Sequence, residues 1–257
     1  AGTADIPVPI GDEDFVSGMI PLERSFYEPG TGTEGTPRQQ VNSITSFIDA
    51  SNVYGSDQLT ADSLRTFTDG KMKTSAGGQL LPVDGGFFAA GDVRSNEQVG
   101  LTTMHTLFVR EHNRLADEFA AVPGIADKAA DAGMTTDEFI YQTARKVVGA
   151  ELQIITYDEF LPALLGSEAI PDYAGYDSDI DPRIANEFST AFYRFGHSML
   201  SPNLLLVDAD REAENLPLRD AFFDPSILAG GNIDVPKDTG IVDRVLRGLA
   251  FQQAQEV

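Results

Sequence analysis

The chain has 257 residues, of which 42% are hydrophobic, so it can bury a sizeable core in one large domain or two small ones. Its 18 Lys and Arg against 40 Asp and Glu give a net charge of −22, which argues against nucleic acid as a partner because phosphates need cationic side chains. The absence of Cys excludes disulfides and thiolate chemistry, and no apolar run approaches the roughly 20 residues that span a bilayer.

Residues 1–40 are rich in Pro, Gly and Thr, and we expect them to form an irregular segment wrapped over a core. Because the stretch that begins at Ala1 is polar, we do not expect it to be a signal peptide. A short segment, 41–54, follows. A turn of helix is then expected at 61–66, before Gly-rich loops that reach residue 90.

Two strong helices are predicted next. The first covers 99–120, where apolar residues recur at intervals of three, four and seven. Its apolar stripe consists of Leu101, Met104, Phe108, Leu115 and Phe119. The second covers 136–156, with a capping box from Thr135 and Glu138 at its start and Phe139, Val147 and Ile154 on its apolar side. A short helix over 157–165 is expected to end at Gly166.

A third helix is predicted over 181–200, because Asp181-Pro182 has the pattern of an N-cap followed by Pro at the first helical position. Its expected core stripe is Ile184, Phe188, Ala191, Phe192, Phe195 and Met199. Further helices are expected over 218–223 and 241–255. Strand signals are sparse, so the predicted class is mostly α.

The chain has three histidines, and they have different expected roles. His105 and His112 lie seven residues apart on one helix face, which is not the spacing of a zinc or di-iron pair, so structural hydrogen bonds are expected. His197 lies off the predicted core stripe, with Arg194 one turn before it. It is either a surface histidine or an axial ligand, with Arg194 facing an anionic group of the cofactor.

Two further groups carry candidate chemistry. Arg94 and Glu97 lie just before the first strong helix, where acidic residues also suit the helix N-terminus. In the second group, four alternating residues offer hydroxyl, carboxylate and main-chain oxygens to Ca²⁺, although one carboxylate alone makes a weak motif. These residues are Thr45, Phe47, Asp49 and Ser51.

Together these motifs resemble the animal-type haem peroxidases of the peroxidase–cyclooxygenase superfamily. The resemblance runs in order over about 41–200 and more loosely to both ends. It is carried by VNSITSFIDASNVYGS, FFAAGDVRSNEQVGLTTMHTLFVREHNRLADE, TARKVVGAELQIITYDEFLPALLG and DPRIANEFSTAFYRFGHSML. It implies the central part of that fold, with helices around a haem b. The expected parts are the 1–40 wrap, a haem-site core over 41–200 and incomplete C-terminal helices over 201–257.

The resemblance also implies residue roles. His197 would be the proximal ligand of the haem iron, and Arg194 a partner of a haem propionate. Arg94 would be the distal arginine, which stabilises charge as peroxide is cleaved. Glu97 would form an ester with a haem methyl. The residues at 45, 47, 49 and 51 would form the family's calcium loop.

The sequence departs from the family pattern in three ways. Gln98 stands where some members have a methionine that links to haem, so that link is not expected. Fatty-acid dioxygenases of the superfamily carry a tyrosine three residues before the proximal histidine, and here that residue is Arg194. The distal histidine belongs to a segment that would precede this chain, and an asparagine that contacts the proximal histidine to one that would follow it.

The resemblance implies a peroxidase that uses hydrogen peroxide to oxidise halide, thiocyanate or small organic donors, outside the cell or in the periplasm. The chain would be a fragment or subunit, with a second chain possible as the source of the distal histidine. Two alternatives stay open at this point. One is a non-catalytic extracellular module that binds haem or calcium, and the other is a fatty-acid dioxygenase.

Overall fold

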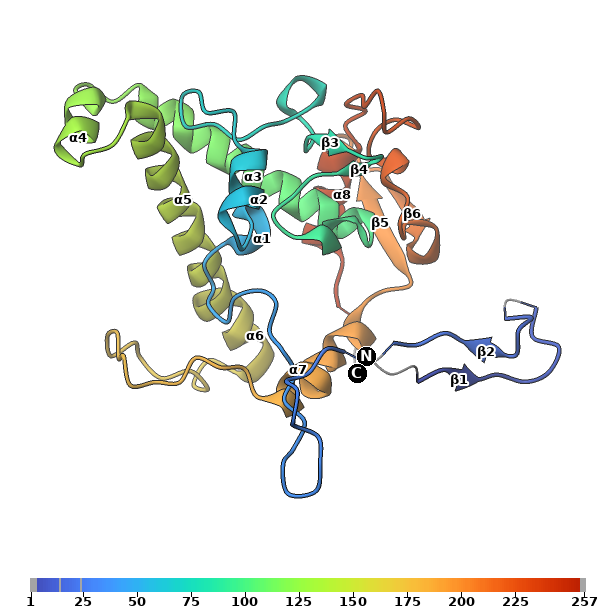
Figure 1. The fold of residues 1–257 in the computed structure, drawn as a ribbon. Helices are drawn as coiled ribbons and strands as arrows, with labels where there is room; N and C mark the ends of the chain where they lie inside the picture. Colours follow the sequence, from blue (N-terminus) through green and yellow to red (C-terminus); the bar gives the residue numbers. More distant parts are fainter. Residues whose placement is uncertain (1–3, 14, 24, 255–257) are drawn as a thin grey trace. The chain divides into compact units, whose positions relative to one another are not determined.

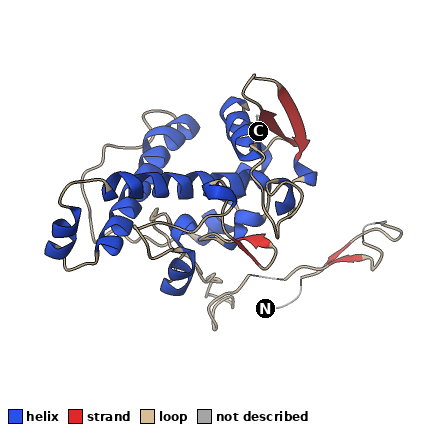
Figure 2. Ribbon diagram, turned by 90° about the horizontal axis from the view of Figure 1, so that it is seen from above, coloured by secondary structure: helices blue, strands red, loops and turns tan. Residues whose placement is uncertain are grey.

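The computed structural model describes residues 4–13, 15–23 and 25–254. Within these ranges the chain divides into two compact units, Ala1–Ser46 with Arg183–Arg194 and Phe47–Pro182 with Phe195–Val257. Helices predominate, which confirms the mostly α class (Figure 1; Figure 2).

The first unit contains little regular structure. Strands β1 (Ile6–Pro7) and β2 (Met19–Ile20) form a short antiparallel pair. The predicted irregular character of 1–40 is therefore largely right. The short helix α7 (Asn186–Thr190) belongs to the same unit, and the Asn186 amide bonds the backbone of residues 38 and 40.

The second unit begins with α1 (Ser51–Tyr54) and α2 (Gln58–Leu64). A 3-10 turn (Ala76–Gly78) and the pair β3 (Val83–Asp84) and β4 (Phe87–Phe88) follow, and a second 3-10 turn (Val93–Asn96) leads into α3. Helix α3 (Val99–Ala120) has the predicted bounds. Helix α4 (Ile125–Asp131), which the sequence pattern did not indicate, precedes α5.

Helix α5 (Thr136–Ile154) starts at the predicted cap, where Glu138 N donates to Thr135 Oγ1 over 3.1 Å. The chain does not leave the helix at Tyr157 as expected. It continues through a π-helical stretch (Ile155–Phe160) into α6 (Leu161–Leu165). This stretch exposes several apolar side chains, among them Ile155, Tyr157 and Phe160.

The prediction that the third helix starts at Asp181 is wrong. Residues 181–185 are not helical, α7 begins at Asn186, and after a break at Ala191 the chain forms a 3-10 helix (Phe192–Met199). The predicted core stripe is not buried, because Phe188 and Phe192 are 52% and 69% exposed. An Asp-Pro pair can start a helix only where the residues that follow it pack against a core. The residues directly after Asp181-Pro182 are exposed, so no helix starts there.

The C-terminal part contains a hairpin that the sequence analysis missed. Strands β5 (Asn203–Val207) and β6 (Ala213–Pro217) pair antiparallel. The helix expected over 218–223 is a 3-10 turn (Leu218–Asp220), and another turn covers Pro225–Ile227. Helix α8 (Ile241–Phe251) ends earlier than the predicted 255, which lies outside the described residues.

The core of the second unit lies between α1, α3, α5, α8 and β5. Helix α3 packs against α5 and α8, and β5 packs against α8. Core side chains include Val53, Tyr54, Phe108, Val109, Tyr141, Val148, Leu204 and Val242. This packing holds the start of α3, where the candidate site lies.

Candidate functional site

Arg94 is fixed by its neighbour Asp92, which caps the 3-10 turn before α3. One carboxylate oxygen accepts from the Arg94 backbone N at 2.9 Å and from Nε at 3.0 Å, and the other accepts from Nη2 at 2.5 Å. Hydrogen bonds from Arg94 hold the pKa of the Asp92 carboxyl below its usual value. The Arg94 side chain is 56% exposed, so its guanidinium is oriented yet accessible.

Glu97 follows on the next turn and is exposed. Its backbone N donates to Arg94 O over 3.0 Å, and its own carbonyl accepts from Phe223 N over 3.0 Å. Gln98 forms an isolated bridge with Phe222. The sequence analysis missed this contact, because a pairing between segments more than 120 positions apart leaves no local pattern.

The Gln98 side chain caps α3, since its Oε1 accepts from Gly100 N over 2.6 Å. This side chain therefore satisfies a backbone N–H at the helix start.

His197 lies on the 3-10 helix that covers Phe192–Met199, and it is exposed. Within the described residues, a Cβ added to the adjacent Gly196 would meet nothing within 4 Å, so a flat group can approach the backbone there. Arg194 also lies on this helix, but it belongs to the first compact unit, whereas His197 belongs to the second.

The predicted calcium loop also crosses the boundary between the units, with Thr45 in the first and Phe47, Asp49 and Ser51 in the second. In the second unit the backbone turns sharply at Ala50, which has φ 60°, and Ser51 N donates to Asp49 Oδ1 over 3.0 Å. Within the described residues no three His, Cys, Asp or Glu side chains form a metal site. A calcium loop built largely from hydroxyl and carbonyl oxygens does not need three such side chains.

The two histidines on α3 are buried. His112 is 0% exposed and both of its ring nitrogens are hydrogen-bonded, which confirms its structural role. His105 is 9% exposed, and burial lowers its pKa. Neither side chain is available as an exposed base.

The exposed groups suit a haem by chemical type. An imidazole at position 197 can bind iron, a guanidinium at 94 can face a bound peroxide, and a carboxylate at 97 can meet a haem methyl. The second unit also exposes large apolar side chains, as a protein does where a flat apolar ligand or another polypeptide covers it. These include Phe195 at 42%, Leu200 at 51% and Phe223 at 67%.

Phe222 also lines a cavity of about 690 Å³. The other lining residues are Pro202, Asn203, Pro217, Leu218 and Arg219. The wall is mainly apolar, with one guanidinium and one amide, and the bridge to Gln98 places it beside the Glu97 segment.

Comparison with known families gives a match along nearly the whole chain. The profile of the family described as animal haem peroxidase matches residues 2–257. Thyroid peroxidase of Sus scrofa is 38% identical over 277 residues, covering 92% of this chain and 28% of the relative. Human myeloperoxidase is 38% identical over 256 residues, covering 87% of this chain and 32% of the relative. The chain thus spans less than a third of these relatives.

Among solved structures, peroxidase A from Dictyostelium discoideum superimposes with a TM-score of 0.77 at 28% identity. The match covers 100% of this chain and 52% of that one. The fatty acid alpha-dioxygenase of Arabidopsis thaliana matches with a TM-score of 0.64 at 20% identity, over 99% of this chain and 43% of that one. The second match shows a shared fold alone.

Proposed function

The chain belongs to the animal haem peroxidase family, and from this we propose that it carries the haem-binding core of a peroxidase. The complete enzyme would reduce hydrogen peroxide and oxidise halide, thiocyanate or small organic donors. The observation that carries the proposal is the Asp92–Arg94 pair, because it holds an accessible guanidinium in a fixed orientation at the start of α3.

In this proposal His197 would hold the iron of haem b, Arg194 would meet a propionate and Glu97 would form an ester link. Bound haem would supply the redox chemistry of peroxide reduction. Arg94 stabilises the negative charge that develops as the O–O bond breaks, and Asp92 keeps its guanidinium in place.

Peroxide must also lose a proton, and neither His105 nor His112 is exposed enough to accept it. We assign that step to a histidine outside these 257 residues, on a further segment or a second chain. The calcium loop at Thr45, Phe47, Asp49 and Ser51 would bind Ca²⁺. The cavity at Phe222 suits a small aromatic donor, because its wall is mainly apolar.

We propose a location outside the cell or in the periplasm, as the resemblance to the animal-type haem peroxidases implies. No helix in the described residues is long and apolar enough to span a membrane.

The test is a haem titration of the purified chain followed by absorption spectroscopy. We expect a Soret band in the parent chain and in Ser198→Ala, and its loss in His197→Ala, because an alanine cannot bind iron. Circular dichroism of each variant checks that it is folded. A Soret band that persists in folded His197→Ala would contradict the assignment of the iron ligand.

The next measurement distinguishes the proposed peroxidase from two alternative functions. Addition of hydrogen peroxide to the haem-loaded chain, with imidazole in the buffer in place of the outside histidine, should change its spectrum, and an external donor should restore it. Binding of haem without this response would favour a non-catalytic module. Oxygen uptake with a fatty acid would favour a dioxygenase, which the arginine at position 194 argues against.

A further inference from the structure

A buried cluster of three rings lies between α1, α3 and α5. Tyr54, His112 and Tyr141 are at most 1% exposed. The ring centroids of Tyr54 and His112 are 5.3 Å apart, those of His112 and Tyr141 5.2 Å, and those of the two tyrosines 5.9 Å, all in edge-to-face geometry. The proposed peroxidase chemistry makes no use of this cluster.

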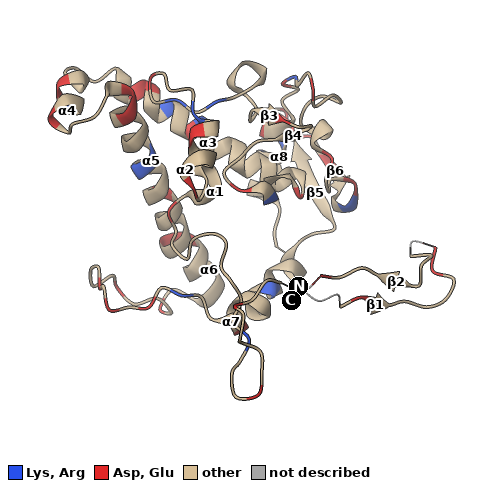
Figure 3. Ribbon diagram, in the orientation of Figure 1, with Lys and Arg blue, Asp and Glu red and all other residues tan. Residues whose placement is uncertain are grey.

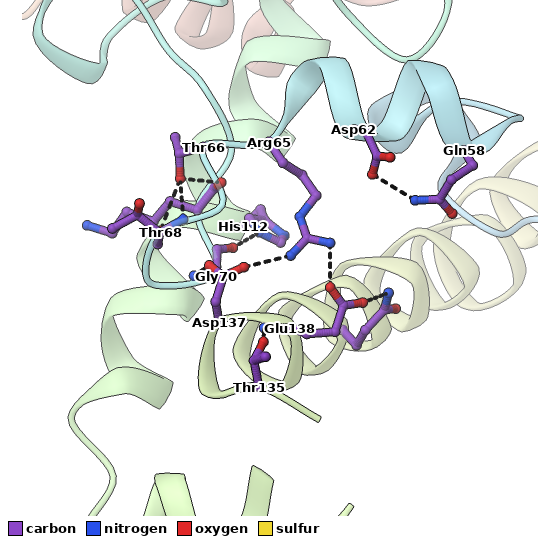
Figure 4. Close-up of polar contacts among 12 residues, drawn as sticks. Gln58, Asp62, Arg65, Thr66, Thr68, Gly70, His112, Thr135, Asp137 and Glu138 are labelled. Atoms are coloured by element: carbon purple, nitrogen blue, oxygen red, sulfur yellow. Dashed lines mark hydrogen bonds and ion pairs between the residues drawn. The ribbon is translucent and has the colours of Figure 1, made fainter. Parts of the chain in front are cut away.

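The hydrogen bonds of His112 define where its proton lies. Nε2 is 2.9 Å from Gly70 O, and because a carbonyl only accepts, Nε2 carries the hydrogen. In the neutral ring Nδ1 is then an acceptor, and Tyr54 OH donates to it over 2.8 Å. Figure 4 shows His112 beside Gly70 and next to the Arg65 side chain.

The backbone keeps this arrangement in place. Gly70 has φ +69°, and a Cβ there would lie 2.5 Å from Ile140 Cγ2 and 2.7 Å from Tyr141 N. A glycine is therefore required for its carbonyl to reach His112. The neighbouring Asp137 side chain also accepts from Gly70 N, over 2.7 Å.

We propose that Tyr54 and His112 form a redox-active pair, in which Tyr54 gives one electron to a strong oxidant while its hydroxyl proton moves to His112. The O–H bond of Tyr54 breaks, an N–H bond forms at Nδ1, and the products are a neutral tyrosyl radical and an imidazolium. Return of one electron and the same proton restores the pair. Bound haem together with peroxide would supply the oxidant, so the biological role rests on the proposed function.

The surroundings favour coupled transfer over loss of a proton alone. Burial raises the pKa of Tyr54, with the nearby Tyr141 adding to the effect, so the resting side chain stays protonated. An oxidised phenol is far more acidic than a neutral one, and His112 is the acceptor already in contact with it.

Positive charges nearby make the pair hard to oxidise. Arg145 lies over the Tyr54 ring, 5.2 Å from its centroid, and Arg65 lies over the Tyr141 ring at 3.8 Å. Burial lowers the pKa of His112 to about 4, and both arginines add to this. Arg65 is partly balanced by ion pairs of 2.9 Å to Asp137 and 2.6 Å to Glu138 (Figure 4). A strong oxidant is therefore needed, and the imidazolium readily returns its proton.

Tyr141 provides a matched control within the same cluster. It is equally buried, but its hydroxyl has no hydrogen-bond partner among the described residues. Oxidation of Tyr141 would leave its proton without an acceptor, so the radical is expected on Tyr54 alone.

The first experiment needs no haem. Because the chain has no cysteine, a single Leu59→Cys, at a position that is 82% exposed, can carry a ruthenium photo-oxidant. The other five tyrosines are replaced by Phe to remove background signals. They are Tyr27, Tyr157, Tyr173, Tyr176 and Tyr193.

After a laser flash with an electron-transfer quencher, transient absorption and electron paramagnetic resonance should show a tyrosyl radical. The signal should be lost in Tyr54→Phe and kept in Tyr141→Phe. It should also be lost in His112→Gln, because an amide can accept the hydrogen bond but does not take up the proton. Circular dichroism confirms that each variant is folded. A signal that survives in folded Tyr54→Phe, or that never appears in the parent, overturns the proposal.

The second experiment applies peroxide to the haem-loaded chain, with imidazole in the buffer in place of the outside histidine, and freezes the reaction for the same spectroscopy. The Tyr54 radical should appear, and Tyr54→Phe should abolish it without changing the Soret band. A chain that takes up no haem counts against the proposed function alone, since the photochemical result decides for Tyr54 and His112 by itself.

Discussion

His112 is a neutral, buried side chain whose two ring nitrogens are both engaged, by Tyr54 and by Gly70. Protonation would put a second hydrogen on the ring, at Nδ1, which now accepts the Tyr54 hydroxyl, and would place a charge on a side chain that is 0% exposed. This explains why burial is the largest cause of its lowered pKa.

A pH dependence of stability follows. The pKa of His112 is about 4 in the folded chain, against an ordinary histidine value of 6.5, so the unfolded chain binds the proton more readily. The stabilisation is fully present above about pH 6.5 and declines as the pH falls toward about 4, by roughly 3 kcal/mol at most. Urea unfolding at pH 7 and pH 5 measures it. In His112→Gln the difference should shrink, and an equal difference in both chains would contradict this prediction.

Two threonines on α3 allow a second test at this scale. Thr103 is 0% exposed and its hydroxyl has no partner among the described residues, whereas Thr106 Oγ1 donates to Thr102 O over 2.8 Å. Thr103→Val should stabilise the chain by about 1 kcal/mol, since it removes an unsatisfied hydroxyl, and Thr106→Val should not. Thermal unfolding of both variants checks this, and a loss of stability in Thr103→Val would be the opposite result.

The same threonines show why α3 was only partly predictable. Its bounds follow from the sequence, because 22 residues without Pro alternate between apolar and polar groups at helical spacing. Its buried face does not, since Thr102, Thr103 and His105 are more buried than Met104, which is 37% exposed. Small hydroxyls such as Thr106 can bond a carbonyl of their own helix, so they enter a core that hydropathy assigns to larger residues.

Among the elements, α8 and β5 lie unusually close together at Gly248. A Cβ at this position would lie 1.6 Å from Leu205 O, so no side chain fits without separating the helix from the strand. Close packing of this kind depends on contacts far apart in the sequence and leaves no local signal. For the same reason, the hairpin β5–β6 was not predicted.

Glycines on two helices should therefore respond in opposite ways to replacement by alanine. Gly248→Ala should destabilise the chain by about 3 kcal/mol through overpacking. At Gly149 on α5, an added Cβ meets nothing within 4 Å among the described residues, so Gly149→Ala should stabilise by up to about 1 kcal/mol. Chemical denaturation compares the two, and equal effects would refute the close contact.

At the scale of the whole molecule, the net charge of −22 is spread over both compact units. Figure 3 shows Asp and Glu on loops and helices alike, with Lys and Arg scattered between them. Mutual repulsion among these carboxylates opposes the compact state. The chain composition established this property directly, whereas the division into two units required the structure.

Salt should therefore raise the thermal stability of the chain. Raising sodium chloride from about 0.05 M to about 0.5 M shortens the screening length severalfold and weakens the repulsion. The melting temperature should rise, as differential scanning fluorimetry can measure. Sucrose at equal osmolality is the control, and a melting temperature that salt leaves unchanged or lowers would show that local ion pairs outweigh the net charge.

The family and the mostly α class could be predicted because the chain shares several long motifs with the family, in the same order. The positions of the site residues could be predicted only in part. Arg94 and Glu97 lie on one turn and its continuation, so local sequence sufficed to group them. The pairing of Glu97 with Phe223 and the exposure of Phe188 and Phe192 depend on what surrounds each segment, which the local pattern does not contain.

The π-helical stretch between α5 and α6 changes the directions in which the side chains of α6 point, and it also lengthens the helical segment. Each residue of an α-helix advances about 100° around the axis, and a wide turn that accommodates one additional residue shifts everything after it by about that angle. Each side chain of α6 therefore points in the direction that the adjacent residue would have in an uninterrupted α-helix. Leu165, which is 57% exposed, is one of them. Removal of a single residue from Ile155–Phe160 would rotate α6 back by one position and leave α5 untouched.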